Sequence, residues 1–288
     1  MIVRPGDAGW PDELGELADP PAELHLRPPA TAERLSELLR PPAVAIVGAR
    51  QASAAGTAFA QRLAAGLARA GVAVVSGLAR GIDGAAHAGA LEAGGRTVAV
   101  LGCGADIDYP RSNAALAARV AAGGAVISEY PPGTPPAPWR FPARNRIVAA
   151  LGQCVVVVEA ARTSGALITA SFALELGREV LAVPASPWVD AAAGGNALLR
   201  DGAGVVTGPG DVLVALGIDP AAAAADDRTA GLSPAAVRLL AAIGRAPGTP
   251  EALGARLAIR PAQLQALIAE LELAGVVVRE SDGSLVDV

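Results

Sequence analysis

The sequence contains no lysine, so all 23 of its basic residues are arginine. A phosphate-binding loop of the GxxxxGK[ST] type needs a lysine at the phosphates, and that class of ATPase is therefore excluded. Schiff-base chemistry and the covalent attachment of pyridoxal phosphate are excluded for the same reason. Arginine stays charged in any environment, and its planar guanidinium suits phosphate, so the sequence can still form an anion-binding site.

Cysteine and histidine are also scarce, with two of each. Cys103, Cys154, His25 and His87 have none of the spacings of a four-ligand zinc site, and we predict no metal. Cys154 opens an apolar run and is predicted to be a core residue. The N-terminus lacks the apolar segment of a signal peptide, and no apolar run approaches about 18 residues. We therefore predict a cytoplasmic protein without a membrane partner.

The net charge of −5 is unevenly distributed along the chain. Residues 1–42 carry four arginines and eight acidic residues, a net charge of −4. Residues 43–217 carry thirteen arginines and eleven acidic residues, a net charge of +2. Residues 218–288 carry six arginines and nine acidic residues, a net charge of −3. A polyanionic partner would therefore bind the middle segment.

Short valine-rich runs recur through this middle segment. They are apolar on both faces, like the strands of a covered parallel sheet, and they span 44–48, 72–76, 97–102, 125–129, 154–160, 179–184 and 203–208. Helical patterns separate most of them, such as 56–71, which ends at Gly71. The alternation predicts an α/β fold with a Rossmann-like, doubly wound, mostly parallel sheet over residues 43–217. Residues 1–42 are predicted to be a short N-terminal extension.

The C-terminal part is predicted to be a separate domain. Residues 218–231 have no periodicity and are expected to be a linker. Three helical patterns and a turn at "SDGS" then predict a small winged helix-turn-helix domain over residues 232–288. Its expected recognition helix, 261–274, carries Glu270 and Glu272 but no arginine. Duplex DNA binding stays an alternative, but a helix facing phosphates is usually basic, which favours protein contact or simple packing.

Glycine-rich segments follow several predicted strands, at the carboxyl ends where an open parallel sheet binds its ligands. They read "GARQAS", "SGLARGIDGAAH", "GCGADIDYP" and "ARTSGALITA". Glycine-rich turns and helix N-termini present backbone N–H groups that suit phosphate oxygens. Arg50 in the first segment reaches over the sheet edge. The four segments together predict an anion-binding rim.

The segment "WRFPARNR", residues 139–146, places three arginines and a phenylalanine within eight residues, with no acidic residue among them. The sequence predicts that Phe141 lies at a helix start, after a flexible proline-rich loop at 130–139. A ring beside cations is typical of a site for single-stranded DNA, where the ring stacks on a base and the arginines bind phosphates. The alternative is a core position for Phe141 and an ion pair of Arg144 with Glu129 or Glu159.

Signs of catalysis are weak. Asp83 and His87 lie four residues apart, on one helix face, but a structural role is favoured in which Asp83 caps the helix and His87 binds a carbonyl. No Ser-His-Asp pattern is visible. The dinucleotide-binding fingerprint is also incomplete, because "GCGADI" has Ile107 at the position of the third glycine. We predict no catalytic residue and no cofactor.

Longer motifs occur in one order between residues 44 and 204, among them "VAIVGAR", "VVSGLARGIDGAAHAGAL", "FPARNRIVAALG" and "VVVVEAARTSGALITASFALELGREVLAVP". In these motifs the sequence resembles the DNA processing protein A (DprA, or Smf) family. The resemblance implies a Rossmann-like protein without known catalysis that binds single-stranded DNA. It also implies loading of the RecA recombinase in natural transformation (competence) and recombination, and a homodimer formed through the Rossmann-like domain.

Carried over by position, the resemblance implies a site for single-stranded DNA. Its residues are Arg50, Arg80, Gly81, Gly102, Gly104, Arg140, Phe141, Arg144, Asn145 and Arg146. Three departures stand out. Many relatives have a helical domain ahead of the sheet, whereas only 42 residues precede it here. Relatives often have a lysine shortly before the phenylalanine, where this chain has Pro138 and Trp139. The usual "VPG" reads "VPA" at Ala185, which bears on the turn after that strand.

Two other functions fit parts of the sequence. Rossmann-like nucleoside monophosphate phosphoribohydrolases are similar in fold and in the Ser-Gly turn, but "EAARTSGALITA" lacks the paired glycine and the catalytic glutamate of their PGGxGTxxE signature. A transcription factor could bind duplex DNA through the winged helix. In that case deletion of residues 218–288 would abolish DNA binding, whereas a single-strand site in the middle segment would survive it.

Overall fold

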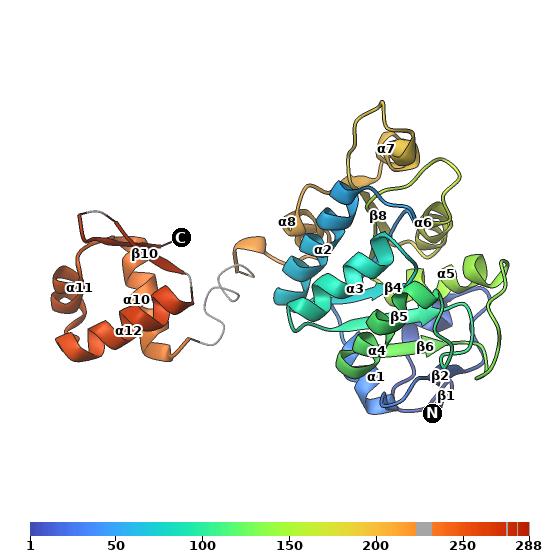
Figure 1. The fold of residues 1–288 in the computed structure, drawn as a ribbon, viewed down its shortest axis with the longest axis horizontal. Coiled ribbons are helices and arrows are strands. Elements are labelled where there is room, and N and C mark those ends of the chain that lie inside the picture. The colour runs from blue at the N-terminus through green and yellow to red at the C-terminus, as the bar shows by residue number, and fades with distance from the viewer. Residues whose placement is uncertain (223–231, 275, 281, 288) are drawn as a thin grey trace. The chain divides into compact units, whose positions relative to one another are not determined.

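The protein is described here by a computed structural model that covers residues 1–222, 232–274, 276–280 and 282–287. The chain divides into two compact units, Met1–Pro220 and Ala221–Val288, each with its own hydrophobic core (Figure 1). Most of the expected linker, residues 223–231, lies outside the described residues. No helix in the described ranges is long and apolar enough to cross a membrane.

The first unit is built on a sheet with strand order β1-β2-β6-β5-β4-β3-β7-β8-β9. The strands are β1 (Ile2–Val3), β2 (Leu24–Leu26), β3 (Ala43–Val47), β4 (Ala73–Ser76), β5 (Thr97–Leu101), β6 (Ala125–Ser128), β7 (Cys154–Val157), β8 (Glu179–Ala182) and β9 (Gly204–Val205). Neighbours from β6 across to β9 pair in parallel. Each of the seven predicted valine-rich runs contains part of one of these strands, so the Rossmann-like, mostly parallel sheet is confirmed.

The order of the strands creates a crevice in the middle of the sheet. The chain winds outward from β3 through β4 and β5 to β6, and then returns to β7, which pairs with the other side of β3. The winding direction reverses between β3 and β7, and such a switch point leaves an opening at the carboxyl ends of the strands. Val47 and Val157 are paired at this end of the two strands.

Helices cover both faces of the sheet. The layers contain α2 (Ala54–Arg69), α3 (Ile82–Glu92), α4 (Ala114–Gly123) and α8 (Pro209–Ala215) on one face, and α1 (Ala32–Leu39), α5 (Arg140–Leu151) and α6 (Ala166–Glu175) on the other. The strands are apolar on both faces because each layer needs a core: Val98 and Val100 pack with the α5 layer, and Leu101 packs with the α4 layer. Cys154 is buried, as predicted. The remaining helices of this unit are α7 (Ala193–Arg200) and the 3-10 helices η1 (Asp12–Glu16), η2 (Arg111–Asn113) and η3 (Asp190–Ala192).

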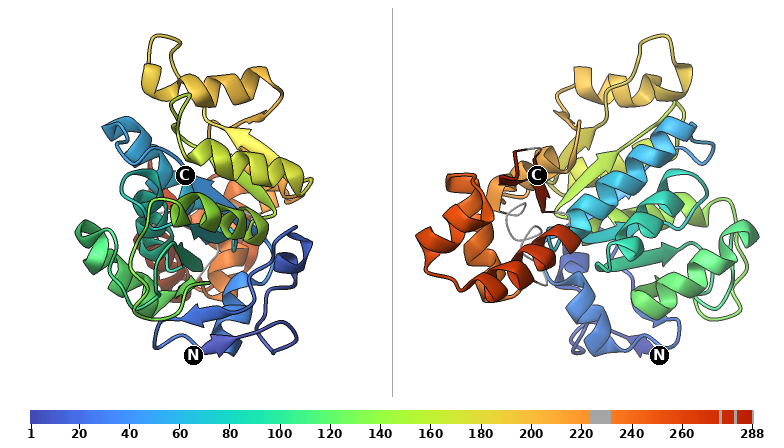
Figure 2. Two further views of the ribbon diagram at one scale, coloured as in Figure 1. Left: turned by 90° about the vertical axis from the view of Figure 1, so that its right-hand side faces the viewer. Right: turned by 60° about the vertical axis from the view of Figure 1, so that its left-hand side comes forward.

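Residues 1–42, expected to be a short extension, enlarge both the sheet and the core. β1 and β2 add two antiparallel strands beside β6. Leu24, Leu35 and Leu38 are buried in the same cluster as residues of β5 and β6. The N-terminal segment lies at one edge of the sheet and β9 at the other, as Figure 2 shows for the dark blue and yellow ends of this unit. The segment thus closes the edge that β6 would otherwise expose.

The second unit is a winged helix-turn-helix, as predicted. It contains α10 (Pro234–Arg245), α11 (Pro250–Leu257), α12 (Pro261–Leu273) and a hairpin of β10 (Val277–Arg279) and β11 (Leu285–Asp287). The carboxylate of Glu270 accepts hydrogen bonds from the backbone N–H (2.5 Å) and the hydroxyl (2.9 Å) of Ser233, just before α10. Glu272 lies 3.6 Å from Arg279 in the hairpin. Both acidic residues of the expected recognition helix therefore have partners within the domain.

Candidate functional site

A pocket opens at the carboxyl ends of the central strands. It has a volume of about 90 Å³ and is lined by Arg50, Gly77, Ala79, Arg80, Leu101, Gly102, Cys103, Tyr109, Pro110, Phe141 and Arg144. A larger groove of about 770 Å³ shares six of these residues and extends to Ser164 and Thr169, which follow β7. Pocket and groove therefore lie where the fold has its topological switch point.

Two stacked rings form one wall of the pocket. Phe141 lies in the first turn of α5, as predicted, and its ring stacks on Tyr109 with centroids 5.2 Å apart and an interplanar angle of 20°. The Cζ atom of Arg50 lies 5.1 Å from the centroid of the Phe141 ring. Phe141 is only half-buried and lines the pocket, so a core position for this residue is wrong.

Tyr109 is the aromatic pocket residue that the prediction of the site missed. It is 39 % exposed and offers an aromatic surface at the pocket entrance. The signal was present in the sequence, because the glycine-rich segment after β5 ends in an aromatic residue, "GCGADIDYP". A ring at the end of such a segment offers the same kind of aromatic stacking surface as Phe141, but it is distant from Phe141 in the sequence.

Arg144 projects from α5 into the base of the pocket and is 4 % exposed. Its Nη1 atom donates to the carbonyl oxygens of Gly77, at 2.8 Å, and of Val100. Burial lowers the pKa of this guanidinium, and the nearby charge of Arg50 lowers it further, whereas Asp83 raises it. The alternative pairing of Arg144 with Glu129 or Glu159 is wrong, because those carboxylates have other partners, described below.

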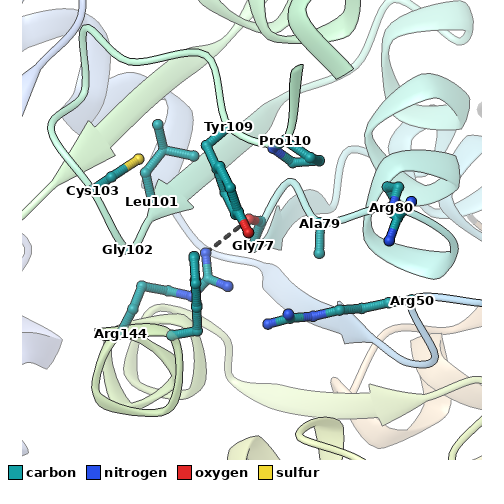
Figure 3. Close-up of a pocket in the computed structure, with 11 residues that line it drawn as sticks. Arg50, Gly77, Ala79, Arg80, Leu101, Gly102, Cys103, Tyr109, Pro110 and Arg144 are labelled. Atoms are coloured by element: carbon teal, nitrogen blue, oxygen red, sulfur yellow. Dashed lines mark hydrogen bonds between the residues drawn. The ribbon is translucent and has the colours of Figure 1, made fainter. Parts of the chain in front are cut away.

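The guanidinium groups of Arg50 and Arg144 point toward each other beneath the Tyr109 ring (Figure 3). Two like charges in a small pocket repel each other, and an anion placed between them would remove that repulsion. Arg80 lines the same pocket and is exposed at its rim. The pocket thus joins three cations to a pair of rings, in a chain whose net charge is −5.

Beneath the pocket, Asp83 and His87 are buried in α3. Asp83 was expected to cap the helix, but no capping hydrogen bond is formed. Its carboxylate instead accepts a hydrogen bond from the backbone N–H of Ala79 at 3.4 Å, and burial raises the pKa of Asp83. The Nδ1 atom of His87 lies 2.7 Å from the hydroxyl oxygen of Thr97. That hydroxyl donates to Val74, so the imidazole is the donor. Burial lowers the pKa of His87 to about 3. The favoured structural role of both residues stands, with different partners.

The proline-rich loop at 130–139 is anchored, although it was expected to be flexible. The backbone N–H of Gly133 donates to both carboxylate oxygens of Asp106, each at 3.0 Å. The N–H of Gly104 donates to the carbonyl of Thr134 at 2.9 Å. Arg140, the first residue of α5, donates to the carbonyl of Pro135. These bonds hold the loop over the segment that follows β5.

Arg146 lies on the other side of α5, away from the pocket. It is 8 % exposed, and its two Nη atoms bind the carboxylate oxygens of Glu129 at 2.7 and 2.8 Å. Its Nε atom donates to the carbonyl of Asp19 at 2.9 Å. Glu159 accepts hydrogen bonds from the N–H and the hydroxyl of Ser53, the N-cap of α2. Each of the two glutamates therefore orders a neighbouring segment of the chain.

The structure brings most of the predicted site residues together. Pocket or groove contacts are made by Arg50, Arg80, Gly102, Phe141, Arg144 and Asn145, whereas Gly81, Gly104 and Arg140 flank the pocket and Arg146 is outside it. Gly102 is needed at its position because a Cβ atom there would lie 2.9 Å from Cδ1 of Phe141. Among the described residues no three His, Cys, Asp or Glu side chains gather in a way that could hold a metal ion.

Fold and site together define a class of protein: a doubly wound α/β protein with a cationic, aromatic pocket at its switch point and a separate winged helix. Residues 1–217 match the family described as DNA recombination-mediator protein A, and residues 220–283 match the DprA winged helix domain. The chain belongs to the DprA/Smf family, whose members act in DNA processing and recombination.

Individual relatives agree with this assignment. The chain is 42% identical to the DNA processing protein DprA of Streptococcus pneumoniae over 207 residues, which are 72% of this chain and 71% of that protein. The X-ray structure of the pneumococcal protein superposes with a TM-score of 0.68 at 40% identity, covering 74% of this chain and 73% of that one. DNA processing protein A of Helicobacter pylori, described for its single-stranded DNA binding mode, superposes with a TM-score of 0.65 at 28% identity, covering 75% and 95%.

Proposed function

We propose that this protein binds single-stranded DNA in the pocket at the switch point. The observation that carries the proposal is the convergence of Arg50 and Arg144 beside the stacked rings of Tyr109 and Phe141. The binding of single-stranded DNA by the relative from Helicobacter pylori supports it. Unstacked bases of a single strand are free to stack on rings, for about 1–3 kcal/mol per base, whereas the bases of a duplex are already stacked.

The proposal extends to what happens after binding. The protein would load RecA recombinase on incoming single strands in natural transformation and recombination, as a cytoplasmic homodimer formed through the Rossmann-like domain. The family description as a recombination mediator supports this role. In this proposal the protein is not an enzyme. The carboxylate of Glu159 serves the N-cap of α2, and Asp83 and His87 have separate partners below the pocket.

The first test is fluorescence anisotropy with labelled oligo-dT and a matching duplex, at two salt concentrations. We expect tight, salt-sensitive binding to the single strand alone. Arg50, Arg80 and Arg140 are free of carboxylate partners in the described ranges, and Arg144 lines the pocket. Three or four neutralised phosphates predict a log–log salt slope of roughly −2 to −3. Deletion of residues 218–288 should leave this binding intact. Flat curves for both DNAs refute the proposal, and loss of binding in the deletion variant favours a winged-helix transcription factor.

RecA loading needs a separate measurement. RecA filaments should form faster on single strands coated with single-strand-binding protein when this protein is added. Arg50→Ala should remove both DNA binding and this acceleration. A protein that binds single strands but leaves the rate of RecA filament formation unchanged would refute the loading role and keep the binding role.

A further inference from the structure

A second group of aromatic and cationic side chains lies next to the pocket. The Cζ atom of Arg140 is 4.8 Å from the centroid of the Trp139 ring and 5.0 Å from that of Tyr130. The two rings meet edge to face, with centroids 6.3 Å apart and an interplanar angle of 88°. None of these three residues lines the pocket. They form a platform, which we call the Trp139 platform, on the anchored loop and the start of α5.

The Trp139 platform is exposed and yet held in place. Trp139 is 63 % exposed, so the guanidinium of Arg140 covers only part of its ring. Arg140 is fixed in turn, because one of its nitrogen atoms donates to the carbonyl of Pro135. A cation over the face of a tryptophan is an attractive contact that orients both side chains. A large ring that is held without being buried is what a nucleobase needs for stacking.

The Trp139 platform and the pocket are both built on the start of α5. Trp139 and Phe141 are two residues apart, so their Cα atoms are separated by at most about 7 Å. Gly102 packs against the start of α5 between them, since a Cβ atom there would lie 2.9 Å from Cδ1 of Phe141 and 3.2 Å from the carbonyl oxygen of Arg140. The two rings therefore project from neighbouring positions at the start of α5, each held by its own contacts. Adjacent bases of a single strand are commonly stacked on successive rings in this way.

We propose that Trp139 is a second base-stacking residue, which binds the nucleobase next to the one at Phe141. Arg140 contacts both the Trp139 ring and the DNA. It positions the ring, and it binds the phosphate between the two nucleotides. One of its nitrogen atoms donates to Pro135, and its guanidinium is not paired with a carboxylate in the described part of the chain, so its charge is left for a phosphate. The inference rests on the proposed function, because it extends the path of the same single strand.

The test uses the fluorescence of Trp139 itself. The chain has three tryptophans, and the variant Trp10→Phe with Trp188→Phe keeps only Trp139. Titration of this variant with oligo-dT should quench its emission, and the quenching should follow the anisotropy curve. In the otherwise unchanged chain, Trp139→Ala should weaken oligo-dT binding about 5- to 100-fold, whereas Trp139→Phe, which keeps a ring, should stay within about threefold of wild type.

Two controls separate stacking from other effects. Trp188→Ala removes a tryptophan that is 92 % exposed and should leave affinity unchanged. The log–log salt slope of Trp139→Ala should equal that of wild type, because stacking releases no counterions. If wild type binds oligo-dT but Trp139→Ala binds equally well and Trp139 is not quenched, the inference is wrong and the proposed function stands. If wild type does not bind oligo-dT, both are wrong.

Discussion

The two sides of α5 give a buried arginine different partners. On the pocket side, Arg144 binds the neutral carbonyls of Gly77 and Val100, and its guanidinium points at another cation. On the other side, Arg146 binds both carboxylate oxygens of Glu129. Both arginines are buried. Local structure thus decides which buried charge is neutralised within the protein and which stays available to an external anion.

The largest effect should come from Arg144→Ala. The variant leaves two buried carbonyls without their donor and removes the cation beside Asp83, so the free energy of unfolding should fall by about 3–5 kcal/mol. Affinity for single-stranded DNA should fall more than about 100-fold, because the phosphate also loses its buried partner. Urea unfolding and oligo-dT anisotropy measure the two losses. Binding within threefold of wild type would show that the two sides of α5 do not differ in function.

Arg146→Ala should separate stability from binding. It leaves the carboxylate of Glu129 unpaired, with only 14% of that side chain exposed, and we expect the free energy of unfolding to fall by about 2–3 kcal/mol. Affinity for oligo-dT should stay within twofold of wild type. Glu129→Ala should behave in the same way, because both variants break one pair. A large loss of affinity in a variant that is still folded would place Arg146 in the DNA site.

Acid should destabilise the pocket side through His87. Its pKa is about 3 in the folded protein because burial disfavours the imidazolium, against an ordinary value near 6.5. The unfolded chain therefore takes up the proton first, and the stabilisation is complete above about pH 6.5 and is lost as pH falls toward 3. The loss approaches about 1.4 kcal/mol per pH unit in that window. Asp83 has a raised pKa and acts in the opposite sense, which reduces the net slope.

Urea unfolding at pH 7 and pH 5 measures this effect, with His87→Gln as the matched variant. Gln keeps a donor for Thr97 but does not titrate, so its stability should change less between the two pH values. Gly195→Ala, which touches no titrating group, should keep the acid sensitivity of wild type. Equal acid sensitivity in wild type and His87→Gln would show that another group controls the pH dependence.

The smallest effect should come from Gly77→Ala, which moves Arg144 without removing it. A Cβ atom at this position would lie 2.4 Å from Nη2 of Arg144 and 2.7 Å from Oδ2 of Asp83. We expect affinity for oligo-dT to fall about tenfold, which corresponds to about 1.4 kcal/mol. Gly195→Ala is the matched control, because its Cβ atom would meet nothing closer than 3.8 Å. Wild-type affinity in Gly77→Ala would mean that the position of Arg144 is not critical.

The sequence predicted the central fold well because its strands carry a strong signal. Buried parallel strands are apolar on both faces, and each valine-rich run proved to contain part of one. The edge strands escaped prediction for the opposite reason. β1 has two residues and β2 has three, too few for any periodicity to appear. Their place in the sheet depends on pairing with β6, which is distant in the sequence.

The site was predicted less completely than the fold. Arg144 and Arg146 belong to one motif, and only their direction on α5 separates them. Helix periodicity carries that information, because position 144 is three residues from Phe141 and shares its side, whereas position 146 is five residues away. Tyr109 could not be paired with Phe141 from the sequence, since β6 and the anchored loop lie between them and only the folded sheet brings the two rings together.

The hydrogen bonds that anchor the proline-rich loop have a consequence for the rate of binding. Gly133 and Thr134 are already held against the segment after β5, so this loop does not have to become ordered when DNA binds. The speed of association is then set by diffusion and by attraction between the strand and the arginines, and the lifetime of the complex by how quickly the stacked bases leave their rings.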